Sequence, residues 1–336
     1  MATVRLIDIA RRVGVSSSTV SAVLSGRDIG IRFSPEKAEE IRAVARELNY
    51  VPNISARILN RQASFTLGVM IDSEDIPVRF RQLAAIERAA SVRGYRLLVT
   101  ETHNDPDSLR KDYLTLKQCG VDGVICHSNI LAATPDLEKK TVFYGAAPVA
   151  GFSTAYYDIG AAYSEAAALF AKNQRRAALV ISDNMSFDSV RARRDAFLQH
   201  FSSAADRLYQ LQLTNDHSSD IRSCMAELLE QQLLPARVNA VILQNDSWCL
   251  AMAAEAARCG LKVPEDLALL GQDNSLFCTC SRPALSSIDS NLPALGEAVL
   301  ELILERIAQA DAPIRCIAVP TKLVPRESTC LPSPNK

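Results

Sequence analysis

The spacing of apolar residues near the amino terminus predicts two short helices joined by a tight turn. Apolar side chains recur at three- and four-residue steps, as on one face of a helix, at Leu6, Ile9, Ala10 and Val13. Gly14 interrupts this pattern, and Ser16 is a favourable N-cap for a second helix. The apolar face of the second helix consists of Val20, Val23 and Leu24. Two short helices with a glycine-containing turn between them form the helix-turn-helix arrangement.

The polar face of the second helix determines what this arrangement can bind. If its apolar residues point inward, the outward residues at its start are Ser17, Ser18, Ser21 and Ala22. Short side chains at this place allow a recognition helix to lie deep in a major groove, where its first turn meets the base edges. The alternative is a plain pair of surface helices with capping serines, and the residues that follow argue against it.

Residues 34–59 extend the pattern to a third helix and a short fourth segment. The run Ser34-Pro35-Glu36 is a helix start, with an N-cap, a proline at the first helical position and an acid in the first turn. The apolar stripe of this helix consists of Ile41, Val44, Ala45 and Leu48. Asn53 can cap one more helix of about seven residues, which is too short to be stable alone in water. It needs a partner, either its copy in a second subunit or DNA, unless the segment is only a linker.

From Phe65 onward the pattern changes to strands that alternate with helices. Apolar runs predict strands at 67–71, 95–100, 121–126, 148–152, 177–181, 209–214, 239–244 and 267–271. Periodic segments predict helices at 79–93, 107–118, 158–172, 188–201, 218–233, 247–259 and 293–309. In the first of these helices we expect Phe80, Leu83, Ile86 and Ala90 to share the buried face. Such alternation implies parallel sheets covered on both faces, here in two α/β lobes that segments near 314–325 complete.

Composition and charge narrow the class of protein. Hydrophobic content of 48% and charged content of 22% are ordinary for a globular protein. No apolar run is long enough for a membrane span, and charges interrupt the amino terminus, so we expect neither a transmembrane helix nor a signal peptide. The nine scattered cysteines then indicate reduced thiols and a cytoplasmic location. Residues 1–62 hold ten Lys/Arg and six Asp/Glu, a net charge of +4, and the remainder carries −5, so the basic end suits phosphate.

Several segments together resemble the LacI/GalR family of bacterial transcription regulators. The amino-terminal matches are IDIA, GVSSSTVSAVL, ELNYVPN and SARIL, and those in the body are VDGVI, QNDSWCLAMAAEAARCGLKVPEDLALLGQDN and LVPRES. The resemblance implies a helix-turn-helix headpiece at 1–50, a hinge helix at 51–63 and an effector-binding and dimerisation domain at 64–336. That body would resemble periplasmic sugar-binding proteins. Its first lobe would span about 65–155 plus 289–313, and its second about 156–288 plus 314–330.

The resemblance also implies which residues meet DNA. The expected contacts are Ser16, Ser17, Ser18, Thr19, Ser21, Ala22, Ser34, Asn53, Ala56, Arg57 and Leu59. Leu59 occupies the position of the family leucine that wedges a base step open from the minor groove, which agrees with the way apolar side chains kink DNA. The recognition positions lack long hydrogen-bonding side chains. We therefore expect base readout that is weak, mediated by water or assigned to DNA deformation, with Ala22 placed to touch a thymine methyl.

The ligand site is expected where strands end, because open parallel sheets bind ligands beyond their carboxyl ends. Strand ends and the resemblance together give Asp72, Ser73, His127, Arg193, Asn245, Asp246, Trp248 and Asp273 as effector contacts. Asn, Asp and Arg offer the donors and acceptors that sugar hydroxyls need. Other interpretations stay open: Asp246 as a helix cap, Arg193 as a solvated residue, His127 as structural, and Trp248 as packed against the wall.

No catalytic motif emerges, so we expect no enzyme activity, cofactor or metal. Cys278 and Cys280 lie close in sequence but have no second ligand pair nearby. No heptad segment follows LVPRES, so we expect no tetramerisation helix there. The resemblance implies a homodimer on a palindromic DNA operator. The sequence thus predicts a cytoplasmic repressor controlled by a small effector, a sugar or a sugar-derived molecule, bound between the two lobes. The alternatives are an activator of the same architecture or a solute-binding protein that is not secreted.

Overall fold

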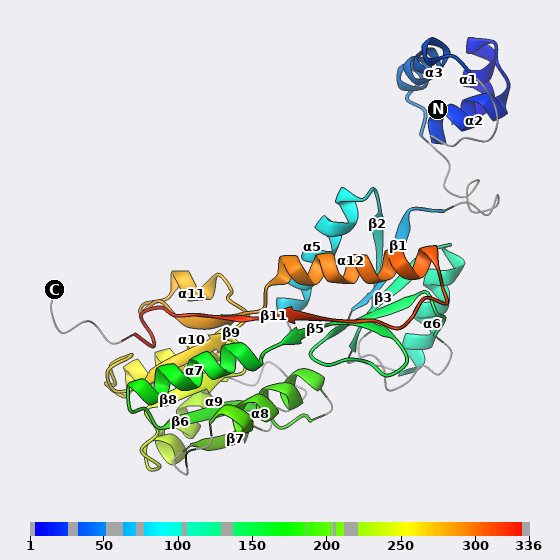
Figure 1. Cartoon of the computed structure of the whole chain (residues 1–336). Coiled ribbons are helices and arrows are strands. Elements are labelled where there is room, and N and C mark those ends of the chain that lie inside the picture. The colour runs from blue at the N-terminus through cyan, green and yellow to red at the C-terminus, as the bar shows by residue number, and fades with distance from the viewer. Residues whose placement is uncertain are drawn as a thin grey trace. The chain divides into compact units, whose positions relative to one another are not determined.

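The computed structural model divides the chain into two units, Met1–Ser64 and Phe65–Lys336 (Figure 1). It describes residues 4–25, 33–51, 63–71, 77–102, 106–128, 137–185, 187–201, 203, 206–211 and 221–330. Among these residues, no helix is both long and apolar enough to cross a lipid bilayer. The first unit is the headpiece, and the second is the body.

The headpiece is helical, and local signals set its helix ends. Its described helices are α1 (Leu6–Val13), α2 (Ser17–Ser25) and α3 (Pro35–Glu47). Helix α1 ends at Gly14, whose φ of 71° lies in the left-handed region that glycine adopts without strain. Helix α3 begins as predicted, because the Ser34 hydroxyl accepts a hydrogen bond from the Lys37 amide at 3.2 Å. Ile9, Val20 and Ile41, one from each helix, are fully buried and hold the three helices together.

The first lobe of the body is a six-stranded parallel sheet with helices on both faces. Its strands, in spatial order, are β11 (Cys316–Pro320), β5 (Ser153–Asp158), β4 (Thr141–Gly145), β3 (Gly123–His127), β1 (Thr66–Ile71) and β2 (Arg96–Glu101). One face packs against α5 (Pro77–Val92) and α12 (Leu292–Ala308), and the other packs against α6 (Pro106–Gln118). The strands are apolar because both of their faces are covered.

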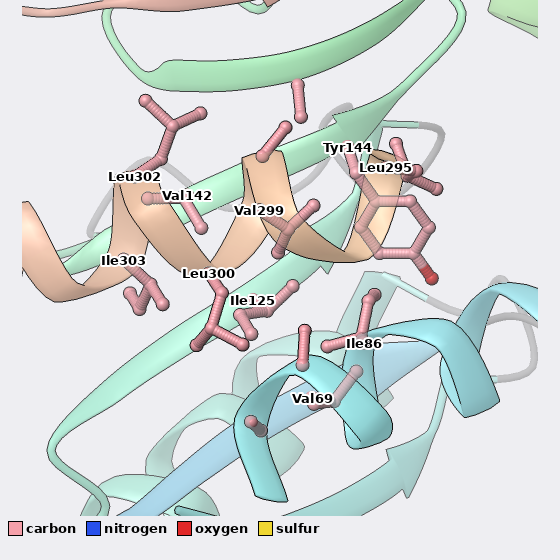
Figure 2. Packing of buried hydrophobic residues seen from close by; sticks show 14 of the residues in the cluster. Val69, Ile86, Ile125, Val142, Tyr144, Leu295, Val299, Leu300, Leu302 and Ile303 are labelled. Carbon is pink, nitrogen blue, oxygen red and sulfur yellow. The ribbon is translucent and has the colours of Figure 1, made fainter. Parts of the chain in front are cut away.

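The helices α5 and α12 pack closely on this sheet, and Figure 2 shows the core beneath them. A glycine allows the approach, because a Cβ atom at Gly296 would lie 2.4 Å from the carbonyl oxygen of Ala85. Helix α12 directs Leu295, Val299 and Leu302 at the sheet, where they belong to the same core cluster as Val142 and Tyr144 of β4 (Figure 2). This packing fixes α5, which carries several residues of the site described below.

The second lobe has a similar layered architecture. Its strands, in spatial order, are β12 (Lys322–Val324), β10 (Ser286–Asp289), β9 (Ala268–Gln272), β8 (Ala240–Leu243), β6 (Ala177–Ser182) and β7 (Arg207–Leu211). All pairs are parallel except β10 with β12. One face packs against α7 (Gly160–Lys172) and α8 (Asp188–His200). The other packs against α9 (Ile221–Leu228), the π-helix η2 (Leu229–Leu233) and α10 (Asp246–Arg258). The short α11 (Phe277–Cys280) contacts α10.

The chain passes between the lobes after β5, after β10 and after β11, and these crossings are tied together. Both the amide and the hydroxyl of Thr321 donate to the Asp158 carbonyl oxygen, at 3.1 and 3.0 Å. The Asn291 side chain donates to the Pro320 carbonyl oxygen at 3.4 Å. The three crossings between the lobes are therefore joined to one another by hydrogen bonds.

The predicted α/β class, with an all-α headpiece and a two-lobed body of mainly parallel sheets, is confirmed. The strand predicted at 148–152 is wrong: this segment is a turn between β4 and β5, with Gly151 at a φ of 84°. Pro148 lacks an amide hydrogen and Gly151 favours a turn, so neither supports a ladder. The placement of 314–330 in the second lobe is also corrected, because β11 pairs with β5 of the first sheet and only β12 joins the second.

Candidate functional site

The first turn of α2 forms the polar face that the sequence predicts. The Ser16 hydroxyl accepts a hydrogen bond from the Thr19 amide at 3.0 Å, and the two hydroxyls lie 2.8 Å apart. Ser16 and Thr19 are therefore engaged in capping. Ser18 is exposed, and Ser17 and Ser21 are half-buried. The accessible surface of α2 is small, polar and uncharged, as a helix that approaches base edges closely requires.

Ala22, which was expected to contact DNA, is buried. Its residue surface is only 1% exposed, so it does not point outward as predicted. The next residue, Val23, is also buried. Ser34 is exposed, and its hydroxyl caps α3. The other expected contacts, Asn53, Ala56, Arg57 and Leu59, lie outside the described residues.

Ion pairs use much of the basic charge of the headpiece. Arg12 pairs with Glu47 at 2.6 Å, and Arg46 pairs with Glu39 at 2.7 Å. Lys37 donates both to Glu40, at 2.8 Å, and to the Val13 carbonyl oxygen, at 2.9 Å. The last bond ties α3 to the end of α1, so Lys37 acts as an internal brace. The net charge of +4 in residues 1–62 already subtracts these acids, so the ion pairs leave it unchanged.

A second candidate site lies where strand ends of the two lobes meet, which we call the interlobe face. Arg81 of α5 donates to the carbonyl oxygens of Asp273 and Asn274 in the second lobe, at 2.6 and 3.3 Å. In the opposite sense, the Asp188 carboxylate of α8 accepts hydrogen bonds from the Ala146 amide at 2.9 Å and from the Ser128 hydroxyl. These bonds join α5 to the loop after β9, and α8 to the residues that follow β3 and β4.

Asp273 lies on this face in a strained backbone conformation. It directly follows β9, and its φ of 94° is rare for a residue with a side chain. Such strain clusters at functional positions. Burial raises the pKa of the Asp273 carboxyl to about 6, while the nearby positive charge of Arg193 opposes the rise and Asp246 adds to it. Asp273 is thus a half-buried acid held close to both lobes.

Asn245 and Asp246 directly follow β8 and have different roles: one caps a helix, and the other holds a neighbouring loop. The Asn245 side chain, rather than that of Asp246, caps α10 by accepting a hydrogen bond from the Trp248 amide at 2.9 Å. Asp246 is 2% exposed and accepts from the Ser287 hydroxyl and the Ser275 amide, each at 2.6 Å. Asp246 therefore holds the loop after β9 in position.

Arg193 and Trp248 have different environments. Arg193 Nε donates to the Gln272 side chain at 2.7 Å, and its Nη1 donates to the Ser189 carbonyl oxygen at 3.1 Å. This places its guanidinium beside the end of β9. Trp248 is 6% exposed and belongs to the core between α10 and the sheet. Of the two interpretations offered for Trp248, the packing role fits this environment.

The first lobe contributes a buried polar cluster that the sequence analysis mostly missed. His127, at the end of β3, is buried, and its Nε2 contacts Arg79 Nη1. Arg79 Nη1 also donates to Gln82 Oε1 at 3.2 Å, and Gln82 Nε2 donates to the Tyr157 hydroxyl at 2.9 Å. The His127 ring stands perpendicular to that of Tyr144, with the ring centres 5.0 Å apart. Asp72 and Ser73, also expected here, lie outside the described residues.

This cluster also corrects the predicted buried face of α5. Phe80 is 59% exposed, whereas Arg79 and Gln82 are 5% and 2% exposed. The apolar periodicity holds only from the middle of the helix, where Ile86 and Ala90 enter the core. At its beginning the helix meets the polar interlobe face instead of the core. The pair of arginines at 79 and 81 was the available sequence signal.

Comparisons with known proteins match both units. Residues 5–53 match the model of bacterial regulatory proteins of the lacI family, and residues 166–329 match the periplasmic binding protein-like domain. The ribose operon repressor of Escherichia coli (strain K12) is 28% identical over 320 residues, which cover 92% of this chain and 94% of that repressor. The transcriptional repressor PurR of Mannheimia succiniciproducens is 27% identical over 338 residues, covering 98% of each chain.

Solved structures share the fold over almost the whole chain. The lac repressor dimer bound to operator and the anti-inducer ONPF has a TM-score of 0.81 and 20% identity, and the match covers 98% of this chain and 100% of that one. The complex of the transcriptional regulator CelR with cellobiose has a TM-score of 0.66 and 22% identity, covering 97% and 99%. The fold is therefore a helix-turn-helix headpiece followed by a periplasmic-binding-protein-like body.

Proposed function

Because the chain belongs to the LacI family of bacterial regulatory proteins, we propose that it is a sequence-specific DNA-binding repressor of transcription. The observation that carries the proposal is the first turn of α2. Ser16 caps it, a closed apolar core supports it, and Ser18 is exposed on its outer side. A rigid short helix with a small polar face suits insertion into a major groove.

In the proposed complex, two copies of the chain read a palindromic operator, one half-site for each headpiece. Leu59 of each copy wedges a base step open from the minor groove at the centre. The small side chains of α2 provide little direct base readout, so the sequence-dependent deformability of the operator supplies part of the specificity. The cytoplasm, where bacterial DNA lies, is the proposed location.

The interlobe face is the proposed effector site. The relatives named above include a ribose operon repressor and a regulator in complex with cellobiose, and a sugar-derived effector is the corresponding proposal for this chain. Asp273, Arg193 and Asn245 offer acceptors and donors from the second lobe. An effector that binds one arrangement of the lobes more tightly shifts the population of DNA-competent dimers by that difference in affinity.

Exposed apolar side chains on the second lobe support pairing of two copies. Leu250 of α10 is 37% exposed, and Leu276 and Phe277 at α11 are 76% and 43% exposed. The helices α10 and α11 contact each other, so these side chains belong to neighbouring elements. Large apolar residues gathered at a surface are typical of a protein interface.

A gel-shift assay on DNA from the promoter region of its own gene tests the proposal. We expect the full chain to bind this duplex specifically, and a duplex with one half-site scrambled to bind more weakly. Leu59→Ala should weaken specific binding while leaving low-salt binding to unrelated duplex nearly intact. A folded protein that binds no duplex at low salt would exclude DNA regulation. A chromosomal deletion that lowers, rather than raises, expression of the target would indicate an activator.

Asp273→Ala tests the effector site in the same assay. The variant should keep DNA binding and lose the response to the effector. Asp195, an exposed acid of α8 that pairs with Arg194 at 2.7 Å, provides the matched control in Asp195→Ala. A retained response in the Asp273 variant would remove this residue from the site.

A further inference from the structure

The buried arginine at the beginning of α5 forms no ion pair with a carboxylate that the structure describes, although its charge acts on Asp273. Arg79 is 5% exposed, and among the residues that the structure describes no carboxylate lies within ion-pair distance of it. Its Nε is buried without a hydrogen-bond partner. Its Nη1 contacts the neutral side chain of Gln82 and the ring of His127. A buried cation without an anion is costly, so this arrangement calls for a functional reason.

Arginines elsewhere in the body show how unusual this is. Arg315 pairs with Glu301 and Glu305, at 2.7 and 2.9 Å, and Arg258 pairs with Glu255. Arg306 is also buried without an acid, but it donates to the carbonyl oxygens of Ala310 and Ala312 just beyond the end of α12. A helix carboxyl terminus carries partial negative charge, which compensates a cation there. Arg306 is therefore explained by the fold.

Arg79 sits at the opposite end of a helix. It lies in the first turn of α5, where free amides and the helix dipole repel a cation and attract an anion. His127 does not compensate it either. A guanidinium can only donate, so the contacting Nε2 of His127 must be the unprotonated acceptor. Burial, together with the charge of Arg79, holds the pKa of His127 well below its ordinary value, which keeps the ring neutral.

The other two arginines of the interlobe face are also held by neutral acceptors. Arg81 donates to backbone carbonyl oxygens, and Arg193 donates to a glutamine side chain and a carbonyl oxygen. Two acids of this face accept hydrogen bonds from uncharged donors, Asp246 from Ser287 and Ser275, and Asp188 from Ser128 and Ala146. The charges of Arg193, Arg81 and Arg79 act on Asp273, but none of the three forms an ion pair with it in the described structure. Guanidinium groups arranged this way favour a bound oxyanion.

We propose that Arg79 binds an acidic group of the effector, a carboxylate or a phosphate, so that the effector is an anionic sugar derivative rather than a neutral sugar. This inference rests on the proposed effector site. The acid group lies at the amino-terminal end of α5, and the hydroxyl groups face Asp273, Arg193 and Asn245 of the second lobe. An anion bound by Arg79 would contact the first lobe while its hydroxyls contact the second. It would therefore favour the arrangement in which the lobes meet.

Inorganic phosphate provides a probe that does not require the natural effector. We compare the full chain with Arg79→Met, following the body transition through the fluorescence of Trp248, the single tryptophan. The variant should be at least as thermally stable in chloride, because a buried unpaired charge is removed. At constant ionic strength, roughly 20 mM phosphate should raise the wild-type Tm by about 2 to 4 °C, and the variant's Tm by far less. Equal shifts in the two proteins would overturn the proposal, as would a large loss of stability of the variant in chloride.

Arg306→Met is the matched control, because Arg306 is similarly buried and its Nε, like that of Arg79, has no hydrogen-bond partner. It should lower the Tm by removing the bonds to the carbonyl oxygens beyond α12, and it should keep the full phosphate shift. If Arg306→Met and Arg79→Met reduced the phosphate shift alike, the effect would come from global loosening. That result would also overturn the assignment to Arg79.

Matched ligands then distinguish the two sources of negative charge. The arms are glucose, glucuronate and glucose 6-phosphate, and ribose with ribose 5-phosphate. We expect an acid to stabilise the protein more than its neutral counterpart, with affinity falling roughly 10- to 100-fold in Arg79→Met. Neutral sugars that bind as tightly as the acids, and equally in both proteins, would overturn the proposal. Gel shifts of Arg79→Met at low salt test DNA binding separately, so a failure of the regulatory function would be recognised as such.

Discussion

The guanidinium group of Arg81 donates a hydrogen bond across the interlobe face to the backbone carbonyl oxygen of Asp273, over 2.6 Å. Its second nitrogen donates to the carbonyl oxygen of Asn274 at 3.3 Å. Both acceptors have positive φ, 94° at Asp273 and 46° at Asn274, so the bonds depend on a particular and strained loop conformation. A side chain of the first lobe thus supports the backbone that presents an effector residue of the second.

Arg81→Met should loosen this loop. Loss of one to two hydrogen bonds to a charged donor corresponds to about 1 to 2 kcal/mol, and to amide exchange that is roughly 5- to 30-fold faster in residues 273–275. Hydrogen–deuterium exchange of the full chain measures it. Arg88→Met, an exposed arginine of the same helix, is the control. Unchanged exchange in the Arg81 variant would show that the second lobe holds the loop without help.

Gly145→Ala should break the hydrogen bond between Ser128 of the first lobe and Asp188 of the second. A Cβ atom at this position would lie 1.7 Å from the Ser128 hydroxyl and 2.8 Å from the Asp188 carboxylate oxygen, so their hydrogen bond could not survive. We expect a loss of about 1 to 3 kcal/mol in the free energy of unfolding, measured in urea. Adding Ser128→Gly should restore part of this loss, because it removes the nearest atoms. Simple additivity of the two changes would contradict the steric explanation.

Asp273→Asn should change how stability depends on pH. Burial raises the pKa of Asp273 to about 6, whereas an unfolded aspartate titrates near 4. The folded state therefore binds the proton more tightly, and the resulting stabilisation is complete below about pH 4 and is lost as pH rises through about 6. Asparagine removes this dependence. At pH 7.5 the variant should be more stable than the wild type by up to about 3 kcal/mol, a difference that shrinks toward pH 4.

Urea unfolding across this pH range measures the difference. Charged neighbours of Asp273 are Arg193, Asp246, Arg81 and Arg79, and all four remain in the variant. A difference between the two proteins that stays constant from pH 4 to 7.5 would mean that Asp273 titrates at its ordinary pKa. In that case burial would not govern this carboxyl.

Ser16→Ala and Ser18→Ala separate capping from DNA contact. Ser16 caps α2, and its loss should cost about 1 kcal/mol and speed amide exchange in the first turn of that helix. Ser18 is exposed, so Ser18→Ala should leave exchange unchanged and weaken specific DNA binding by roughly 5-fold. Exchange and gel shifts on the same preparations give both quantities. An unaltered affinity in Ser18→Ala would remove this residue from the DNA-contacting face.

Local signals made the headpiece and the element order predictable. The caps at Ser16 and Ser34 lie within three residues of the amides they bind, and both were inferred from residue type and position. The alternation of strands and helices in the body follows from short apolar runs that are covered on both faces. Such features depend on neighbours in the chain, which the sequence displays directly.

The interlobe face was only partly predictable because its partners are distant in the chain. Asp273 could be chosen from its place after a strand, but the contact with Arg81 spans 192 residues. Periodicity placed Phe80 in the core and overlooked Arg79, since it assumes that the inward face of a helix always meets apolar atoms. Trp248 and Ala22 are both buried. Residue type alone did not specify this, because their burial depends on tertiary packing.

The division of both sheets between distant parts of the chain also constrains how the protein is made. Strands β11 and β12 leave the ribosome after the other described strands, and they complete the edges of the first and second sheets respectively. Neither lobe is therefore whole until these strands have emerged, whereas the helices α1 to α3 precede both lobes in the chain. The part proposed to read DNA is finished long before the part proposed to control it.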